Sequence, residues 1–506
     1  MDYYITNNTS AAVCLRDIPT VDYAAFYDDL CGKLACERYH LAHYFAYPEQ
    51  QTHLRFYCLL LDDEQSQVLI TSFVMDYYAE DALPSLTARY PQVHLFEREI
   101  TELFGVQFEG LPWDKPLRYP FNRARQGNTI DNYPFYTIES SSLHEVNVGP
   151  IHAGIIEPGA FRFICNGEQV LHLEIALGYQ HRGVEQAFTA TRNSLRQVVL
   201  AESVAGDSAV SHATAFVETV EKLAPHSRRT AELHLERAVA LELERMAMHI
   251  ADTAALCTDV GYQLGQVACE ALRTLTINTT QAWCGNRFGK GLIRPFGTNH
   301  PLTVEKATQI AGQIAEIQRR YEEVSNDIQT SPTLLARLEQ CGVVSREEMV
   351  RIGAVGQAAR ACGLARDIRT SHPWGVFAAE THHTAILKDQ GDVMARLQIR
   401  QEEVVQSADY IQQFLANFIP STTIHTPIYD FKSMPDALSF ALIEGWRGEI
   451  CHVAVTDSQG AFAAYKIKDP SLHNWPALAL AVRGEGISDF PICNKSFNLS
   501  YCGHDL

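Results

Sequence analysis

Three blocks of the sequence combine histidine, arginine and carboxylate side chains at spacings that could support chemistry. Residues 149–163 read GPIHAGIIEPGAFRF, residues 178–186 read GYQHRGVEQ, and residues 241–250 read LELERMAMHI. Imidazole and carboxylate groups can carry protons or line a ligand site. Taken singly, each histidine is more simply interpreted as a core or surface residue. The spacing of the residues must therefore indicate whether they form a functional site.

The third block has the clearest spacing. Glu242, Arg245 and His249 are separated by three and four residues, which places them on one face of a helix. That face could be an exposed ladder of salt bridges, or it could point into the protein. The same helix, expected over about 229–260, carries an apolar stripe that packs against a core. The stripe consists of Leu235, Val239, Leu243, Met246 and Ile250.

The cysteines do not form a recognisable metal site. The chain has 13 of them, no two form a C-x-x-C motif, and the closest pair is Cys31 and Cys36. A zinc or iron–sulfur site built from this chain alone needs clustered thiolates. Scattered cysteines in a cytoplasmic protein are usually small buried hydrophobes.

Composition and charge exclude several classes of protein. The chain has 506 residues, 46% of them hydrophobic and 20% charged, which is typical of a globular protein of several domains. Its net charge of −19 disfavours nucleic acid as a partner. No stretch approaches ~18 uninterrupted apolar residues, and the first residues form neither a basic nor an apolar region. We therefore expect neither a membrane span nor a secretory signal.

Residues 1–115 are predicted to form a small α+β domain. They contain 18 acidic residues and seven Lys or Arg, a net charge of −11, which sets them apart from the rest. A linker over residues 116–145 follows, rich in proline and without periodicity. In the first domain we expect a helix over 21–38, strands over 53–61 and 67–74, a short helix near 83–90, and helical spacing over 93–110.

Residues 146–506 are predicted to form a second, mainly helical domain. It begins with two or three strands around the Asn166-Gly167 turn. Helices are expected over about 184–203, 211–224, 229–260, 303–331 and 392–418, with Thr303 as an N-cap. The tail at 436–485 mixes strands with a helix. The predicted fold class is α+β: a small α+β N-terminal domain, then a large helical bundle with an N-terminal β-hairpin sheet and a C-terminal α+β part.

The segment EREITELFG at 97–105 carries the first family resemblance. Its plain interpretation is a charged helical turn with solvated carboxylates. The pattern nevertheless resembles the signature of the 30 kDa subunit family of respiratory complex I. The matching residues are Glu97, Arg98, Glu99, Glu102 and Gly105. Leu111 and Pro112 stand where the family places a basic residue. In that family the domain is a scaffold, so this departure has little consequence.

The three titratable blocks resemble the 49 kDa subunit of complex I and the large subunit of energy-converting (group 4) nickel–iron hydrogenases. The matching residues are Gly149, Pro150 and His152, then His181, Arg182, Gly183 and Glu185, then Glu242, Arg245 and His249. In these families the third block lies on a helix of the central bundle, which favours the inward-facing interpretation.

Two later stretches extend the resemblance, which runs from about residue 85 to residue 506. The first, ARACGLARDIRTSHPWGVF, matches through Arg360, Gly363, Asp367, Arg369, His372 and Pro373. The second, GDVMARLQIRQEEVVQS, matches through Gly391, Asp392, Arg396, Arg400, Glu402, Glu403 and Ser407.

The metal ligands of the hydrogenases are not reproduced. Those enzymes hold nickel and iron by four cysteine thiolates, and the resemblance places the four positions at Ala205, Ser208, Cys502 and Asp505. Alanine has no donor, and serine gives up its proton only at high cost. We therefore expect no metal to be bound by this chain, which by itself would not be a competent nickel–iron hydrogenase.

Complex I offers quinone as another ligand. Its family binds the quinone head through a histidine in the first hairpin loop and a tyrosine. His152 fits the start of that loop, but Glu157 lies where the later histidine is expected, and Gly206 stands at the tyrosine position. Quinone therefore stays an open alternative without a supporting motif.

What remains is a cavity framed by the scaffold of the family. It could bind another ligand, carry protons or be vestigial. Its candidate lining residues are His152, Glu157, Asp207, Ser208, His212, Arg360, Cys502, His504 and Asp505.

The resemblance implies a peripheral subunit of a membrane-bound, complex-I-like or hydrogenase-related ion-translocating complex. The subunit would lie on the cytoplasmic side of the cell membrane and couple the peripheral arm to the membrane subunits. Implied partners are a small iron–sulfur subunit resembling the 20 kDa protein of complex I, which would hold the cluster, and antiporter-like membrane subunits.

Two alternatives stay open. The first is a quinone or other small-acceptor reductase subunit in a complex driven by NADH or ferredoxin. The chain has no G-x-G-x-x-G after a strand, so NAD would have to bind elsewhere. The second alternative is a structural relic that only holds a partner in place.

Overall fold

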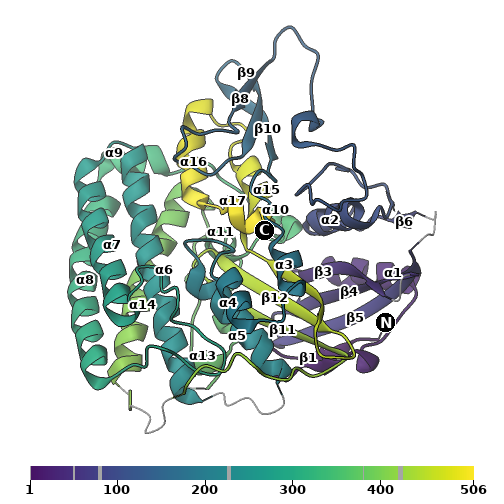
Figure 1. Cartoon of the computed structure of the whole chain (residues 1–506). Helices are drawn as coiled ribbons and strands as arrows, with labels where there is room; N and C mark the ends of the chain where they lie inside the picture. Colours follow the sequence, from purple (N-terminus) through teal and green to yellow (C-terminus); the bar gives the residue numbers. More distant parts are fainter. Residues whose placement is uncertain are drawn as a thin grey trace.

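The N-terminal part of the chain is an antiparallel sheet covered by two helices. It belongs to a computed structural model, which describes residues 2–49, 52–77, 82–224, 230–379, 381–416, 418–419 and 425–506. The strands are β1 (Tyr4–Thr6), β3 (Tyr39–Glu49), β4 (His53–Asp62) and β5 (Gln67–Asp76), in the order β1-β5-β4-β3. Helices α1 (Tyr23–Leu34) and α2 (His94–Phe104) close a separate apolar core with them, as seen on the right of Figure 1.

The predicted helix over 21–38 and both predicted strands are confirmed, but the short helix near 83–90 is wrong. Residues Leu83–Pro84 form strand β6, which pairs with β7 (Phe108–Glu109). The turn that follows is held by the carboxylate of Glu97, which accepts hydrogen bonds from the Ser85 hydroxyl at 2.6 Å and the Leu86 amide at 2.8 Å. These bonds satisfy the backbone in a non-helical conformation.

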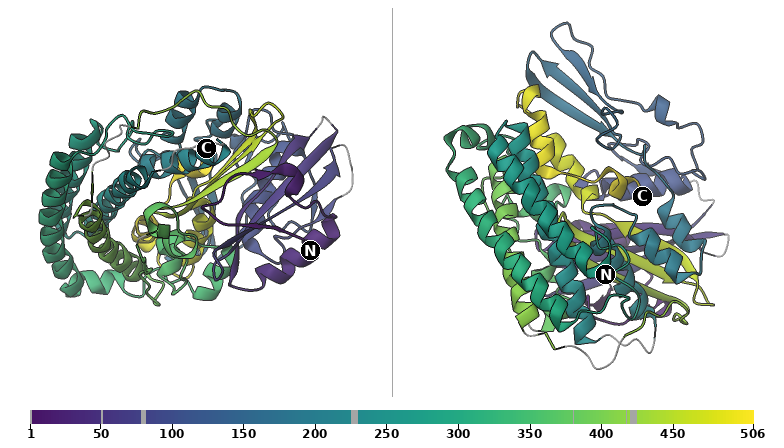
Figure 2. Two further views of the ribbon diagram at one scale, coloured as in Figure 1. Left: turned by 90° about the horizontal axis from the view of Figure 1, so that it is seen from below. Right: turned by 60° about the vertical axis from the view of Figure 1, so that its left-hand side comes forward.

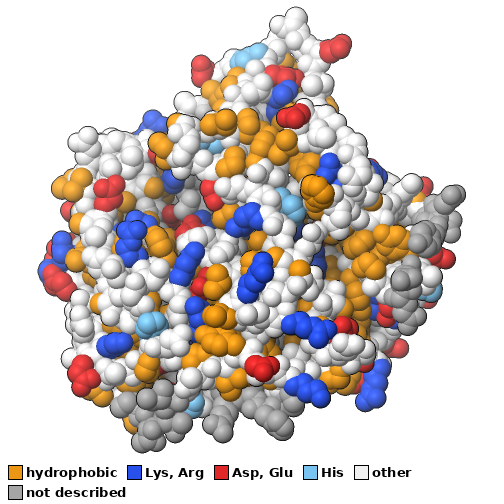
Figure 3. All heavy atoms as spheres, viewed as in Figure 1, with side chains coloured by type: hydrophobic (Ala, Val, Ile, Leu, Met, Phe, Trp, Pro, Cys, Tyr) orange, Lys and Arg blue, Asp and Glu red, His pale blue; other side chains and the backbone are white. Residues whose placement is uncertain are grey.

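A three-stranded sheet projects from the rest of the molecule at the top of Figure 1. Its strands are β8 (His144–Val148), β9 (Ala160–Asn166) and β10 (Gln169–Ala176), in the order β10-β9-β8. Gly167 has a φ of 59°, which confirms the predicted turn between β9 and β10. Hydrophobic side chains gather over the lower part of this hairpin sheet in Figure 3.

Four long helices form the bundle of the large domain. They are α6 (Ala231–Asp259), α7 (Gln263–Cys284), α8 (Val304–Thr330) and α14 (Val393–Ala416). Figure 2 shows them as a layer remote from the N-terminal sheet. The Thr303 side chain accepts a hydrogen bond from the Lys306 amide, which confirms the predicted N-cap. Residue 229, the expected start of the helix over 229–260, lies outside the described residues. So does Pro420, before which the helix over 392–418 is expected to end.

Shorter helices complete the domain. They are α3 (Val184–Thr189), α4 (Ser194–Ala201), α5 (Ala209–Leu223), α9 (Pro332–Leu338), α10 (Arg346–Ile352), α11 (Gly356–Arg360), α12 (Ile368–Ser371), α13 (Gly375–Ala379), α15 (Ser471–Ala481), α16 (Phe490–Phe497) and α17 (Tyr501–Asp505). The single helix predicted over 184–203 is wrong, since it is divided into α3 and α4. Asn193 caps α4 by accepting a hydrogen bond from the Arg196 amide at 3.1 Å.

The two ends of the chain meet in one sheet. Strands β11 (Ala437–Gly445), β12 (Gly448–Thr456) and β13 (Phe462–Lys468) are joined by β2 (Val13–Cys14), in the order β13-β12-β11-β2. Cys14 is in register with Ala437. Some N-terminal residues are therefore part of the sheet of the large domain. Among the described helices, none is both long and apolar enough to cross a lipid bilayer.

We predict that Asn8→Ala lowers the free energy of unfolding by about 3 kcal/mol, as measured by chemical denaturation. The buried Asn8 amide donates to the carbonyls of His372 and Leu442 at 2.9 and 2.8 Å and accepts from the Leu442 amide. Truncation leaves these backbone groups without partners. The control is Asn147→Ala, at an exposed position on β8, where a change within about 0.5 kcal/mol is expected. Equal effects of the two variants would contradict the role given to Asn8.

Candidate functional site

The carboxylates of the EREITELFG motif anchor backbone segments. Glu97 holds the turn after β6, and Glu102 accepts hydrogen bonds from the amides of Leu117, Arg118 and Tyr119 at 2.9–3.2 Å. The side chain of Arg98 donates in turn to two carbonyls of the same linker. The motif is therefore a set of anchors that fasten the linker to α2.

Glu99 lies in a charged cluster that joins α2 to the large domain. Its carboxylate contacts Arg118 at 2.5 Å and Lys466 of β13 at 2.8 Å, and Lys466 also contacts Glu185 of α3 at 2.5 Å. Burial alone would raise the pKa of Glu99, but Lys466 and Arg118 outweigh it and lower the value to about 2. For Glu185 burial dominates, and the pKa is raised despite Lys466.

The third sequence block points into the protein, as the family resemblance indicated. Glu242 accepts hydrogen bonds from Arg245 at 3.1 Å and from Ser407 of α14 at 2.6 Å. Arg245 also donates to the Glu444 and Gly445 carbonyls. All three residues of the block are fully buried, and His249 contacts Glu403 of α14 at 2.8 Å. The block is not an exposed ladder.

The same network includes the later motif residues. Arg360 contacts Asp367 at 3.2 Å, Glu403 at 2.7 Å and Glu444 at 2.9 Å. Arg369 contacts Asp367 and Glu403 at 2.8 and 3.0 Å. Burial opposes ionisation of Glu403, but Arg360 and His249 hold its pKa well below the ordinary value. Arg360 is therefore a member of this buried network.

The C-terminal helix α17 is fastened to the loop after β10. The Asp505 carboxylate accepts hydrogen bonds from the amides of Gly178 and Gln180 at 2.8 and 2.9 Å and contacts His504 at 2.9 Å. The ring of His181 bonds the Asp505 carbonyl at 2.8 Å. Asp505 thus has several hydrogen-bond partners within the protein.

Arg182 brings the two regions of missing cysteines together. Its guanidinium donates to the carbonyls of Ser203 and Val204 on one side and to the Cys502 carbonyl, at 2.9 Å, on the other. The predicted proximity of the 203–208 loop to the C-terminus is thereby present.

Asp207 forms a bidentate ion pair with Arg447, at 2.7 and 2.6 Å. Arg447 also donates to Ser208 at 3.3 Å and to the Asn498 carbonyl at 2.6 Å, and it lies over the Trp446 ring. The Asp207 side chain is 37% exposed, whereas Arg447 is buried. This ion pair therefore lies at the boundary between interior and solvent.

The resemblance assigns the four sulfur positions to Ala205, Ser208, Cys502 and Asp505. Ala205 offers no ligand atom, and a guanidinium cation donates to the Ser208 hydroxyl. Cys502 alone offers a thiol, and burial raises its pKa to about 12. Asp505 is already bonded to backbone amides. Within the described part of the chain, no group of three or more His, Cys, Asp or Glu side chains is arranged to hold a metal ion.

The loop between β8 and β9 places His152 and Glu157 near the same region. His152 bonds the Gly159 carbonyl at 2.9 Å, and Glu157 lies 3.5 Å from the Cys502 amide. Ile151 and Ile155 on this loop are 81% and 87% exposed. The loop thus presents apolar side chains to its surroundings.

His212 lies one helical turn after Ser208, whose carbonyl accepts a hydrogen bond from the His212 amide at 3.0 Å, and its ring belongs to a buried polar chain. It bonds His452 at 3.0 Å and Asp469 at 3.1 Å, and His452 continues to the Tyr465 hydroxyl at 2.8 Å. Of the nine candidate lining residues, the structure brings together those of the 149–159, 203–208 and C-terminal segments. His212 adjoins the 203–208 segment but directs its ring to His452 and Asp469, whereas Arg360 lies in the central buried network.

The remaining motif residues stabilise the packing of distant segments. His372 bonds the Gln67 carbonyl of β5 at 3.2 Å. Arg396 donates to the Gly342 and Gly391 carbonyls, and Arg400 contacts Asp252 of α6 at 2.8 Å.

Sequence reasoning missed Glu444, Arg447 and His383, which contact Arg360, Asp207 and Asp367 respectively. No periodic pattern surrounds them. The only sequence signal is that a buried arginine or aspartate requires a residue of opposite charge nearby.

Family models match two parts of the chain. Residues 11–123 match the 30 kDa subunit of respiratory-chain NADH dehydrogenase, and residues 259–435 match the 49 kDa subunit.

Curated relatives span most of the chain. Hydrogenase-4 component G of Escherichia coli K12 is 25% identical over 464 residues, covering 88% of this chain and 80% of that protein. The C/D subunit of the NADH-quinone oxidoreductase of Phocaeicola vulgatus is 25% identical over 438 residues, covering 76% of this chain and 79% of that protein.

A solved structure has the same fold over the larger part of the chain. A chain of the membrane-bound sulfane sulfur reductase, an archaeal respiratory membrane complex, superposes with a TM-score of 0.67 at 20% identity. It covers 73% of this chain and 100% of its own length.

The carboxylate of Glu244 beside the 203–208 loop gives a pH test. It accepts hydrogen bonds from the amides of Val210 and Ser211, and burial raises its pKa to about 7. The folded protein therefore binds a proton more tightly than the unfolded chain does. Stability from this group is present below the unfolded pKa and is lost as the pH rises through about 7.

We predict that Glu244→Gln removes a pH-dependent loss of about 3 kcal/mol in the free energy of unfolding between pH 5 and 8. Urea denaturation at several pH values measures this loss. Glu339→Gln, at an exposed position, should leave the wild-type pH profile unchanged. A profile in Glu244→Gln that matches the wild type would refute the assignment.

Proposed function

We propose that this chain is a peripheral-arm subunit of a membrane-bound ion-translocating oxidoreductase complex. It combines a part that matches the 30 kDa family of complex I with a part that matches the 49 kDa family. It works without a nickel–iron centre and couples the peripheral arm to the membrane subunits. The relatives support this role, since one is named as a hydrogenase component and another as a part of NADH-quinone oxidoreductase.

The observation that carries the proposal is the replacement of the sulfur ligands. Where four thiolates would be needed, the resemblance places an alanine, a serine bonded to a guanidinium, one cysteine and an aspartate bonded to amides. Arg182 nevertheless joins the 203–208 loop to the C-terminus. A scaffold kept without its metal ligands supports a role in coupling.

A continuous polar chain supports the coupling role. It starts at the half-exposed Asp207 and passes through Arg447 to the Asn498 carbonyl at 2.6 Å. The Asn498 amide donates to Asp252 at 2.6 Å, and Asp252 contacts Arg400 at 2.8 Å. These contacts connect a side chain at the edge of the protein to α6 and α14 of the bundle.

The same proposal includes partners and location. A small iron–sulfur subunit resembling the 20 kDa protein of complex I would pack beside the 203–208 loop and hold the cluster. Antiporter-like membrane subunits would carry the ion, and the chain would lie peripherally on the cytoplasmic side of the cell membrane. The negative charge of −19 also fits a protein surface as the partner better than nucleic acid.

A second candidate is a reductase subunit for quinone or another small acceptor. The 149–159 loop favours it, because His152 lies next to exposed isoleucines that could contact an apolar tail. Inhibition by a quinone analogue that changes in His152→Ala would support this second function.

We predict that the complex purified through this chain contains less than a tenth of a nickel atom per copy and neither forms nor consumes hydrogen. Elemental analysis and hydrogen electrode measurements test this. A matched preparation of a hydrogenase with all four cysteines is the control. Stoichiometric nickel would overturn the proposal.

We predict that Asp207→Asn leaves assembly of the complex intact but lowers the ions moved per electron by at least half, since it removes one charge of the Asp207–Arg447 pair. Ion transport and electron transfer are measured together in membrane vesicles. Asp327→Asn, at an exposed position on α8, is the control and should behave as wild type. Unchanged coupling in Asp207→Asn would favour the structural relic.

A further inference from the structure

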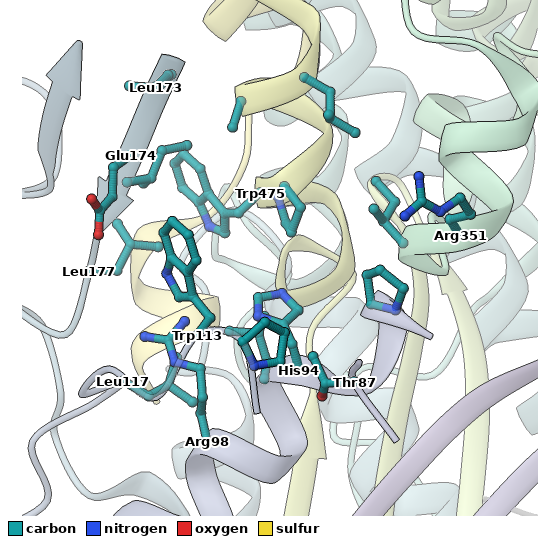
Figure 4. Close-up of a pocket in the computed structure, with 18 of the residues that line it drawn as sticks. Thr87, His94, Arg98, Trp113, Leu117, Leu173, Glu174, Leu177, Arg351 and Trp475 are labelled. Atoms are coloured by element: carbon teal, nitrogen blue, oxygen red, sulfur yellow. The ribbon is translucent and has the colours of Figure 1, made fainter. Parts of the chain in front are cut away.

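A cavity lies between the two family domains and borders the C-terminal segment, since His504 is among its lining residues. Its volume is about 500 Å³, within the range of small-molecule sites. Its walls come from α2 and the linker on one side, and from β10, α10 and α15 on the other. Figure 4 shows side chains from both sides directed toward it.

Most of the wall is apolar. Buried aliphatic side chains cover it, and two indole rings, Trp113 and Trp475, are among the lining groups (Figure 4). The aliphatic residues include Leu95, Leu117, Leu173, Leu177 and Ile352. Such a surface in contact with water is unfavourable, so an apolar molecule of matching size would be stabilised here.

The charges around the cavity are unbalanced. Arg98, Arg351 and Arg483 line it, and among the described residues no carboxylate forms an ion pair with any of the three. Arg351 and Arg483 are exposed residues, whereas Arg98 is only 7% exposed and donates to two backbone carbonyls. A buried guanidinium without a counter-charge is costly, which favours an anion nearby.

The acids of the cavity do not supply that anion. Glu174 is paired with Lys115 at 2.6 Å and also accepts the Tyr136 amide. Glu348 bonds Ser345 in the capping box of α10. Burial keeps His94 neutral, with a pKa lowered to about 3, so it adds no further positive charge.

Hydrogen-bond donors in the wall also lack partners. The indole N–H of Trp475 bonds no group of the described residues, although the side chain is only 3% exposed. A buried tryptophan N–H normally has an acceptor. Nε2 of His172, another lining residue, is also without a partner there.

We propose that this cavity binds an anionic amphiphile, a molecule with an apolar body and a carboxylate or phosphate head. The apolar body lies against the leucines and indoles. The head accepts hydrogen bonds from the Trp475 N–H and the arginines. Because its walls belong to both domains, the ligand contacts α2 and α15 at once.

The test titrates the full-length chain with decanoate, decyl phosphate, decanol and decyltrimethylammonium, and follows tryptophan fluorescence and calorimetric heat. We expect one saturable site for the two acids. Decanol and the cationic amphiphile should bind at least tenfold more weakly. Equal binding of acid and alcohol, or the absence of a saturable site, overturns the proposal.

Variants locate the site. Ala479→Trp fills the cavity and should abolish binding of decanoate, while Trp475→Phe, which keeps a ring but removes the N–H, should weaken it about tenfold. The double change Arg351→Gln and Arg483→Gln should weaken decanoate and leave decanol unchanged. Arg196→Gln, at an exposed position on α4, is the control and should bind as wild type. Unaltered binding in Ala479→Trp overturns the proposal.

The last test of the proposal uses the complex extracted from membranes. Native mass spectrometry should detect an acidic amphiphile released from the wild-type protein and not from Ala479→Trp. A photoreactive side chain placed at Ala479 shows what occupies the cavity. Cross-linking to a partner polypeptide instead of a small molecule overturns the proposal.

Discussion

The need to neutralise every buried charge shapes the large domain. Helix α6 brings Glu242, Arg245 and His249 into an interior that water does not reach, and isolated charges there would cost more than the whole stability of a domain. Arg360, Arg369, Glu403 and Glu444 supply the opposite charges from α11, α12, α14 and β11. Elements far apart in sequence are held at fixed positions because each completes the charge balance of the others.

At the edge of the large domain, a buried charge is again paired with an opposite charge. Asp207 and Arg447 are paired as closely as the groups of the central network, yet one partner reaches solvent. The pair joins a solvent-accessible carboxylate to a guanidinium that is itself buried. Behind it, the Asn498 carbonyl accepts a hydrogen bond from Arg447, and the Asn498 side-chain amide donates to Asp252. The charge balance is thus fully buried in the central network and reaches solvent at the edge of the domain.

Local sequence patterns predicted the features that depend on neighbours along the chain. The i, i+3, i+7 spacing of Glu242, Arg245 and His249 indicated one helical face, and Thr303 indicated a helix start. The patterns failed where a side chain distant in sequence determines the local structure. The turn after β6 is held by hydrogen bonds to Glu97 of α2, and the sequence of residues 83–90 alone does not indicate these bonds. Arg447, about 240 positions from Asp207, was invisible for the same reason.

Strand β2 has a consequence for the order in which the protein is made. Residues Val13–Cys14 precede their partner on β11, which begins at Ala437, by more than four hundred residues. Strand β2 therefore has no partner until β11 has been synthesised. The sheet of the large domain is therefore completed only when a segment near residue 13 pairs with a strand synthesised much later.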